Sequence, residues 1–71
     1  MIKINKKDII KKLEKETCIK FSDRSIDLLD SSLDSYINGS SIEEIKLEKS
    51  LKGRSLELVI LAISFYDELV S

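Results

Sequence analysis

Four aspartates are the side chains in this sequence with the clearest chemical potential. Asp23, Asp27, Asp30 and Asp34 follow one another at spacings of four, three and four residues. In a helix, these spacings place all four carboxylates on one face. Carboxylate oxygens bind hard cations, but a cation site needs ligands that converge from several directions, and a single straight row does not converge. We therefore predict a solvated acidic face, with a surface for a basic partner as the alternative.

Cysteine and histidine chemistry is nearly absent from the sequence. Cys18 is the only cysteine, and there is no histidine. A cysteine nucleophile needs a base, and an internal disulfide or an ordinary zinc site needs further cysteines or histidines. The sequence also contains no glycine-rich loop of the kind that binds phosphates. We predict no enzymatic activity, cofactor, metal or small-molecule substrate, and we expect Cys18 to be a small buried or half-buried side chain.

The charges are distributed unevenly along the chain. Residues 1–20 hold seven lysines against three acidic residues, a balance of +4, whereas residues 21–71 hold five basic and ten acidic residues, a balance of −5. The net charge is −1. Any attraction to nucleic acid must therefore be local, because the whole molecule offers no positive field.

A chain of 71 residues predicts one small domain, residues 1–71. A domain of this size buries only about 60% of the surface that it exposes when unfolded, so it usually needs a disulfide, a metal or a partner for support. With the first two excluded, a partner chain is expected. The start, "MIKINKKDIIKK", lacks the apolar core of a signal peptide, and "LELVILAISFY" is shorter than the 20 or so apolar residues of a membrane span. We predict an intracellular protein with no membrane contact.

Apolar spacing and capping residues predict a wholly helical fold. A helix over residues 6–17 would be capped by Asn5, and a short extended segment would follow before a second helix begins at Ser22 or Asp23. In "SYINGSSIEEI", Asn38-Gly39 is typical of a turn and the following serine of a new helix. However, a helix that continues through Gly39 keeps later leucines on the apolar stripe of the second helix, whereas Ile42 and Ile45 fall off it. This phase favours one long helix over residues 23–51, with a turn as the alternative.

The last helix, from Leu56 to Val70, is apolar on nearly all sides. "KGRS" precedes it, with Gly53 expected to end the long helix in a left-handed conformation and Ser55 to cap the last one. A helix that is apolar all round is normally buried all round. Because two short preceding segments cannot cover it, we predict an obligate oligomer.

This order of elements resembles the histone fold: a short helix, a long central helix and a shorter last helix. "IKFSDRSIDLL" resembles the first loop and the start of the central helix in that family, and "KGRS" resembles its second loop. "KDIIKKL" and "SLELVILAISFYD" are most similar to the histone-fold proteins of the centromere protein X kind. The resemblance implies a kinetochore or DNA-repair type of complex in the nucleus. The implied partners are a second histone-fold chain of the centromere protein S kind, or a second copy, and duplex DNA.

The resemblance also implies site residues. In a histone pair, the first loop of one subunit lies beside the second loop of the other, and both face the DNA backbone. The DNA contacts would then come from Lys20, Lys52 and Arg54 in the loops and from Lys6, Lys7 and Lys11 near the first helix. The predicted partner interface consists of Leu29, Leu33, Tyr36, Leu47, Leu51, Val59, Ile63, Phe65 and Tyr66.

A second function remains open at this point. A turn at Asn38-Gly39 would give a compact four-helix bundle, and the acidic balance of residues 21–71 suits a protein that binds other proteins. Such modules include immunity proteins, antitoxins and phage regulators. Helix phase and the loop resemblance favour the histone-fold interpretation over this alternative.

Overall fold

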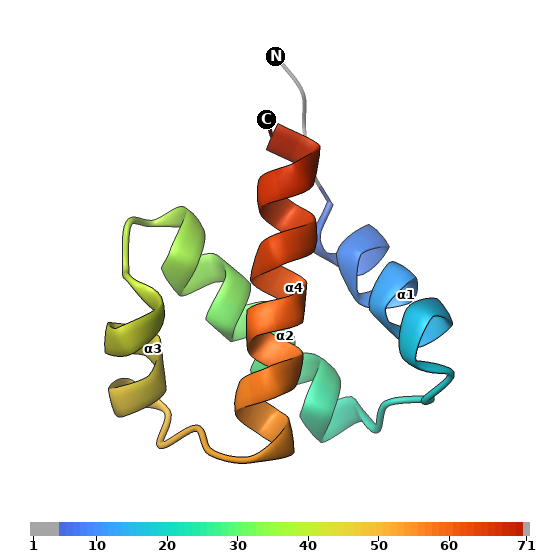
Figure 1. Cartoon of the computed structure of the whole chain (residues 1–71), viewed down its shortest axis with the longest axis horizontal. Coiled ribbons are helices and arrows are strands. Elements are labelled where there is room, and N and C mark those ends of the chain that lie inside the picture. The colour runs from blue at the N-terminus through green and yellow to red at the C-terminus, as the bar shows by residue number, and fades with distance from the viewer. Residues whose placement is uncertain (1–4, 71) are drawn as a thin grey trace.

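A computed structural model describes residues 5–70, and every regular element in that range is a helix. The helices are α1 (Lys6–Thr17), α2 (Asp23–Ile37), α3 (Ile42–Glu48) and α4 (Arg54–Val70). Figure 1 shows α4 crossing in front of α2, with α1 on one side and α3 on the other. The all-α fold class is confirmed. The predicted domain also includes residues 1–4 and 71, which lie outside the described residues.

The predicted starts of α1 and α2 are confirmed by their caps. The Asn5 side chain accepts a hydrogen bond from the Lys7 N–H at 2.9 Å, and the Ser22 hydroxyl accepts one from the Ser25 N–H at 3.3 Å. Each bond satisfies a backbone donor that the first helical turn leaves unpaired. Residue 18 ends α1 in the left-handed conformation, with φ of 57°.

The predicted long helix over residues 23–51 is wrong, because α2 ends at Ile37 and the chain turns. The Gly39 N–H donates to the Tyr36 carbonyl at 3.1 Å, and the Ser40 N–H donates to the Ser35 carbonyl at 2.9 Å. These two bonds form a Schellman motif, which requires positive φ at its central residue. Gly39 has φ of 108°, a conformation that glycine adopts at little steric cost.

Local hydrogen bonds define both ends of α3. At its start, the Ser41 hydroxyl accepts from the Glu44 N–H at 3.2 Å, and the Glu44 carboxylate accepts from the Ser41 N–H at 3.1 Å. This reciprocal pair is a capping box. At its end, the Leu51 N–H donates to the Lys46 carbonyl at 3.0 Å while Ser50 takes positive φ.

Gly53 was expected to end the central helix in a left-handed conformation; the conformation is confirmed, but the position at the end of a helix is wrong. The helix before it ends earlier, at Glu48, and Gly53 lies directly before α4. Its φ is 61°, and its carbonyl accepts from the Glu57 N–H at 3.2 Å. Gly53 therefore lies at the start of the last helix, two residues before the predicted cap at Ser55.

The burial of α3 explains why the helix-phase argument failed. Ile45, which falls off the continuous stripe, is fully buried, whereas Leu47, which lies on the stripe, is 78% exposed. The turn therefore resets the phase of the chain, so that α3 packs on α2 through a different face. The off-stripe position of Ile42 and Ile45 was the signal for the break.

The hydrophobic core lies where α1, α2 and α4 meet. Its buried side chains are Ile9, Ile10, Leu13, Phe21, Leu29, Leu33, Ile45, Leu51, Val59, Ala62 and Ile63. All three pairs among α1, α2 and α4 are in contact. One face of α4 is thus covered within the chain, while the opposite face is left partly exposed. Among the described residues, no helix combines the length and apolar character that a membrane crossing requires.

Candidate functional site

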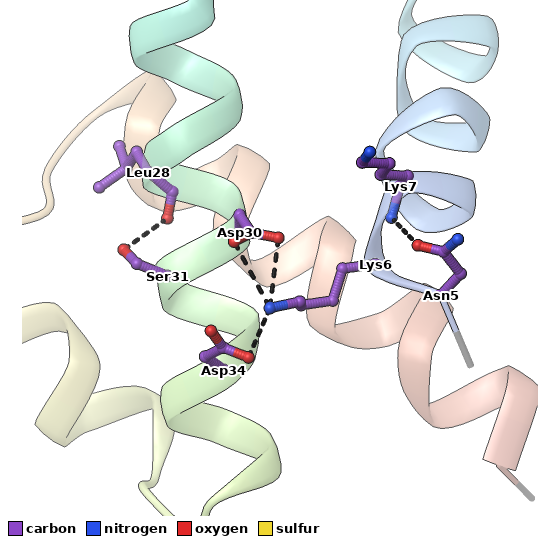
Figure 2. Close-up of polar contacts among 7 residues, drawn as sticks. All are labelled: Asn5, Lys6, Lys7, Leu28, Asp30, Ser31 and Asp34. Carbon is purple, nitrogen blue, oxygen red and sulfur yellow. Dashed lines mark hydrogen bonds and ion pairs between the residues drawn. The ribbon is translucent and has the colours of Figure 1, made fainter. Parts of the chain in front are cut away.

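The acidic row on α2 contacts a lysine from α1. Lys6 Nζ lies 2.6 Å from Asp34 Oδ1 and 3.3 Å from Asp30 Oδ1, as Figure 2 shows. The hydrogen bond that Lys6 donates to Asp34, together with its contact with Asp30, raises the pKa of Lys6 above its ordinary value despite partial desolvation. The predicted phosphate contact at Lys6 is thus already engaged with two carboxylates of its own chain.

The other half of the row, Asp23 and Asp27, is exposed to solvent. Within residues 5–70, no group of three or more acidic, cysteine or histidine side chains is arranged to hold a metal ion. The row therefore acts partly as an anchor between two helices and partly as a solvated acidic edge.

The remaining predicted DNA contacts fall into two separate groups. Lys7, Lys11 and Lys20 are exposed on α1 and the connection that follows it, whereas Lys52 and Arg54 are exposed before and at the start of α4. Figure 1 shows the α1–α2 connection and the α3–α4 connection on opposite sides of the start of α4. One copy of the chain therefore does not bring the six predicted residues onto one surface.

Two adjoining hollows run along α1 on its lysine-bearing flank. One, of about 230 Å³, is lined by Lys7, Ile10, Lys11, Glu14 and Ile26. The other, of about 390 Å³, is lined by Glu14, Lys15, Cys18, Ile19 and Lys20. Glu14 borders both, so they form one continuous surface, which we call the lysine-rimmed groove.

Two residues of this groove change the sequence-based assignments. Lys15 was not among the predicted site residues, although its spacing of four from Lys11, which is itself four after Lys7, marks one helix face. Cys18, predicted to be buried or half-buried, is exposed instead. It lies at the C-terminal end of α1 in a left-handed backbone conformation.

Most of the predicted partner interface lies inside the chain's own core. Leu29, Leu33, Leu51, Val59 and Ile63 are buried against other helices of the same chain. A partner reaches these side chains only if the helices separate.

The aromatic members of the predicted interface are partly buried. The Tyr36 hydroxyl donates to the Asp67 carboxylate at 2.9 Å, and its ring meets that of Tyr66 edge to face at 5.8 Å. The hydrogen bond to Asp67, followed by desolvation, raises the pKa of Tyr36. The ring of Phe65 lies 4.9 Å from the Lys12 ammonium, which also pairs with Glu68 at 3.8 Å. These contacts attach α1 and α2 to the C-terminal half of α4.

The outward face of α4 carries apolar side chains beside acidic ones. Glu57, Ile60, Leu61, Ser64 and Glu68 are spaced so that they share one helix face, and all five are exposed. Ile60 is 39% and Leu61 40% exposed. We call these five residues the α4 stripe.

Other large apolar side chains are exposed elsewhere, namely Leu47 on α3, Ile37 at the end of α2, and Leu69 and Val70 at the end of α4. Of the nine predicted interface residues, Leu47 is the one that is largely exposed to solvent. It is therefore open to a partner without any rearrangement of the core.

Comparison with known proteins gives no relative. No family model matches this sequence, and no curated protein or solved structure is significantly similar to it. Proposals about function therefore rest on the residues and surfaces described above.

Proposed function

We propose that this chain is a non-catalytic four-helix module that acts by binding another protein. The α4 stripe carries the proposal, since two branched apolar side chains at its centre are about 40% exposed on a helix whose opposite face forms the core. Interfaces between proteins typically have an apolar centre and a polar rim. Glu57, Ser64 and Glu68 supply such a rim around Ile60 and Leu61. Immunity proteins, antitoxins and phage regulators are modules that act in this way.

The DNA-associated histone-fold subunit is the less favoured alternative. It requires a continuous central helix, and α2 and α3 are separated by a turn with glycine at positive φ. It also requires loop cations brought together by pairing, and in a single copy Lys20 and Lys52 belong to connections on opposite sides of the start of α4 (Figure 1). A nuclear location and a second histone-fold partner belong to this alternative alone.

Site-specific photo-crosslinking in the cell that makes the protein tests the proposed function. A photoreactive amino acid at position 61 lies in the α4 stripe, and the matched control at position 43 replaces an exposed glutamate on α3. We expect a discrete protein adduct, identified by mass spectrometry, from position 61 and none from position 43. Equal or absent adducts from both positions would show that the α4 stripe is not a binding surface.

A second experiment tests whether the crosslinked adduct depends on the charge of the rim of the α4 stripe. Glu57→Lys and Ser64→Lys change the charge of the rim at exposed positions, so the chain should keep its helical circular dichroism. With the probe at position 61, these changes should reduce the yield of the adduct. An unchanged yield would mean that the adduct reports proximity alone.

A further inference from the structure

We propose that the partner of the α4 stripe is a second copy of this chain, in which the stripe binds the lysine-rimmed groove. This inference rests on the proposed function, and it adds the identity of the partner and the surface that receives the stripe. It assigns a binding role to Lys7, Lys11 and Lys15 through carboxylates, where the histone resemblance implied phosphates for the first two.

The groove has unpaired positive charge along an apolar floor. Lys7, Lys11 and Lys15 rise along one face of α1 over about 12 Å, at 1.5 Å per residue. Among residues 5–70, none of these three ammonium groups, nor that of Lys20, forms an ion pair, whereas Lys6 and Lys12 are paired with carboxylates. Ile10, Ile19 and Ile26 line the hollows between them.

Glu14 is the one acidic residue of the groove, and its carboxylate has a structural role. Its Oε2 atom accepts a hydrogen bond from the Phe21 N–H at 3.0 Å, which fixes the connection between α1 and α2. This bond holds part of the negative charge against the backbone. The four rim lysines therefore outnumber one carboxylate that is already engaged.

The α4 stripe has the opposite charge and the same arrangement. Ile60 and Leu61 lie at its centre, and Glu57 and Glu68 lie toward its ends, over about 16 Å of helix. Glu68 already pairs with Lys12 of its own chain at 3.8 Å, but its side chain is 67% exposed and remains accessible to a second cation. Arg54 is the single basic residue of the α4 sequence, at its first position. An apolar centre with acidic ends thus faces an apolar floor with a basic rim, and the two surfaces are similar in length. Complementary charge of this kind sets register and excludes wrong pairings.

The stripe of one copy does not reach its own groove, because α4 packs on one side of α1 and the groove lies on another side of α1. The side of α1 that carries Lys12 packs on α4, since Lys12 contacts Phe65. The groove lies on the side that meets Ile26 of α2. A contact between two different surfaces is heterologous, so successive copies form a closed ring or an open chain.

Nucleic acid is the other polyanion that a row of lysines attracts, and the groove suits it less well. Phosphate contacts require cations but no apolar floor. Ile10 and Ile26 would gain no partner from a sugar-phosphate backbone, and the Glu14 carboxylate would face it with like charge. The α4 stripe, with its isoleucine, leucine and glutamate side chains, suits both the apolar floor and the basic rim of the groove.

Sedimentation velocity on the purified full chain, with a charge exchange between the two surfaces, tests the proposal. One variant, Lys7→Glu with Lys11→Glu, reverses the rim of the groove, and the other, Glu57→Lys with Ser64→Lys, reverses the stripe. All four positions are exposed. We expect concentration-dependent association of the native chain that weakens at high salt, because salt screens exposed charges. Each variant alone should associate at least about tenfold more weakly.

An equimolar mixture of the two variants should regain association, because each reversed surface again meets its opposite. The control, Lys46→Glu with Lys52→Glu, makes the same change in net charge as the groove variant but outside both surfaces, and it should associate like the native chain. Circular dichroism establishes that each variant keeps its helices. A mixture that stays monomeric would overturn the proposal, as would a control that weakens association as much as the groove variant.

The two failures are distinguishable. A native chain that is monomeric at all concentrations, but whose position 61 crosslinks to a different protein, overturns self-association and leaves the proposed function intact. A monomeric chain without any adduct overturns both. Duplex DNA that binds the native chain and not the groove variant, with no self-association, assigns the groove to nucleic acid and also overturns the proposal.

Discussion

Helix α3 and the layer formed by α1, α2 and α4 are stabilised by different kinds of interaction. In that layer, fully buried side chains such as Leu13 and Leu33 come from helices that all contact one another. The seven residues of α3 contribute Ile45 to the core, but both of its ends are fixed by bonds to neighbouring residues in sequence. The first region depends on long-range burial, and the second depends mainly on local capping.

This difference shows how a short helix persists beside a small core. A helix of seven residues is not stable in isolation, because nucleation outweighs the few hydrogen bonds that it gains. The capping box at Ser41, the turn at Gly39 and a single buried isoleucine together compensate. In exchange, Leu47 is left on the surface, where it is available for contacts between molecules.

The largest expected effect compares one substitution in the two regions. Leu33→Ala removes a fully buried side chain and should cost about 2–5 kcal/mol, a large part of the roughly 4–10 kcal/mol expected for a domain of this size. Leu47→Ala, on α3, should change the free energy of unfolding by less than about 0.5 kcal/mol. Urea denaturation of both variants measures the difference. Equal losses would mean that Leu47 is buried in solution.

The next effect concerns the turn that separates the regions. Gly39 has φ of 108°, and an added Cβ would meet no neighbour within 4 Å, so Gly39→Ala tests conformation alone. The substitution should cost about 1–3 kcal/mol, because side chains strain this backbone conformation. Gly53→Ala, at φ of 61°, is the matched control and should cost less, since the left-handed helical region is tolerated better. If Gly39→Ala stabilised the protein, the turn at Gly39 would be contradicted and one continuous helix over residues 23–51 would be favoured instead.

A smaller effect distinguishes local unfolding of α3 from global unfolding of the chain. Ser41→Ala removes the capping box of α3 and should cost about 1 kcal/mol. Amide hydrogen exchange should then speed up in α3 while α4 keeps its protection. Ser22→Ala, which removes the N-cap hydrogen bond of α2, is the control and should loosen the whole core. Equal exchange in both variants would show that α3 unfolds only with the rest of the chain.

The smallest effect depends on pH and concerns the layer of α2 and α4. The pKa of Tyr36 is raised above its ordinary value of 10.0, chiefly by the hydrogen bond to Asp67. A raised pKa stabilises the fold below the unfolded pKa, and this contribution is lost as pH rises through the folded pKa. At neutral pH, the native protein should therefore have a higher Tm than Tyr36→Phe. This difference in Tm should disappear as the pH rises above 10. A gap that is constant with pH would show that the hydroxyl bond adds nothing to stability.

Some features were readable from the sequence because they depend on neighbouring residues. The helical class, the caps at Asn5 and Ser22 and the acidic face of α2 all follow from spacing over a few positions. The capping box from Ser41 to Glu44 and the turn at Asn38-Gly39 were equally local. The phase argument was nevertheless preferred, although Ile42 and Ile45 were seen to fall off its stripe.

The candidate binding surfaces could be predicted only in part from the sequence. The spacing of Lys7, Lys11 and Lys15 was visible, but its apolar floor comes from Ile26 on another helix. The predicted interface contained Leu29 and Leu33 because apolar spacing does not tell a core within one chain from a core between two chains.

Sequence alone therefore determined where α1 and α2 begin, which faces are apolar and how charge is divided along the chain. Tertiary structure decided which apolar face is covered and which is not. Packing of α4 against α1 and α2 buries Val59 and Ile63 and leaves Ile60 and Leu61 outside, although all four are similarly apolar. It also pairs Lys6 with Asp30 and Asp34 while leaving Lys7 unpaired among the described residues. The reason is physical: burial and ion pairing depend on distances between helices, and spacing along one helix does not encode them.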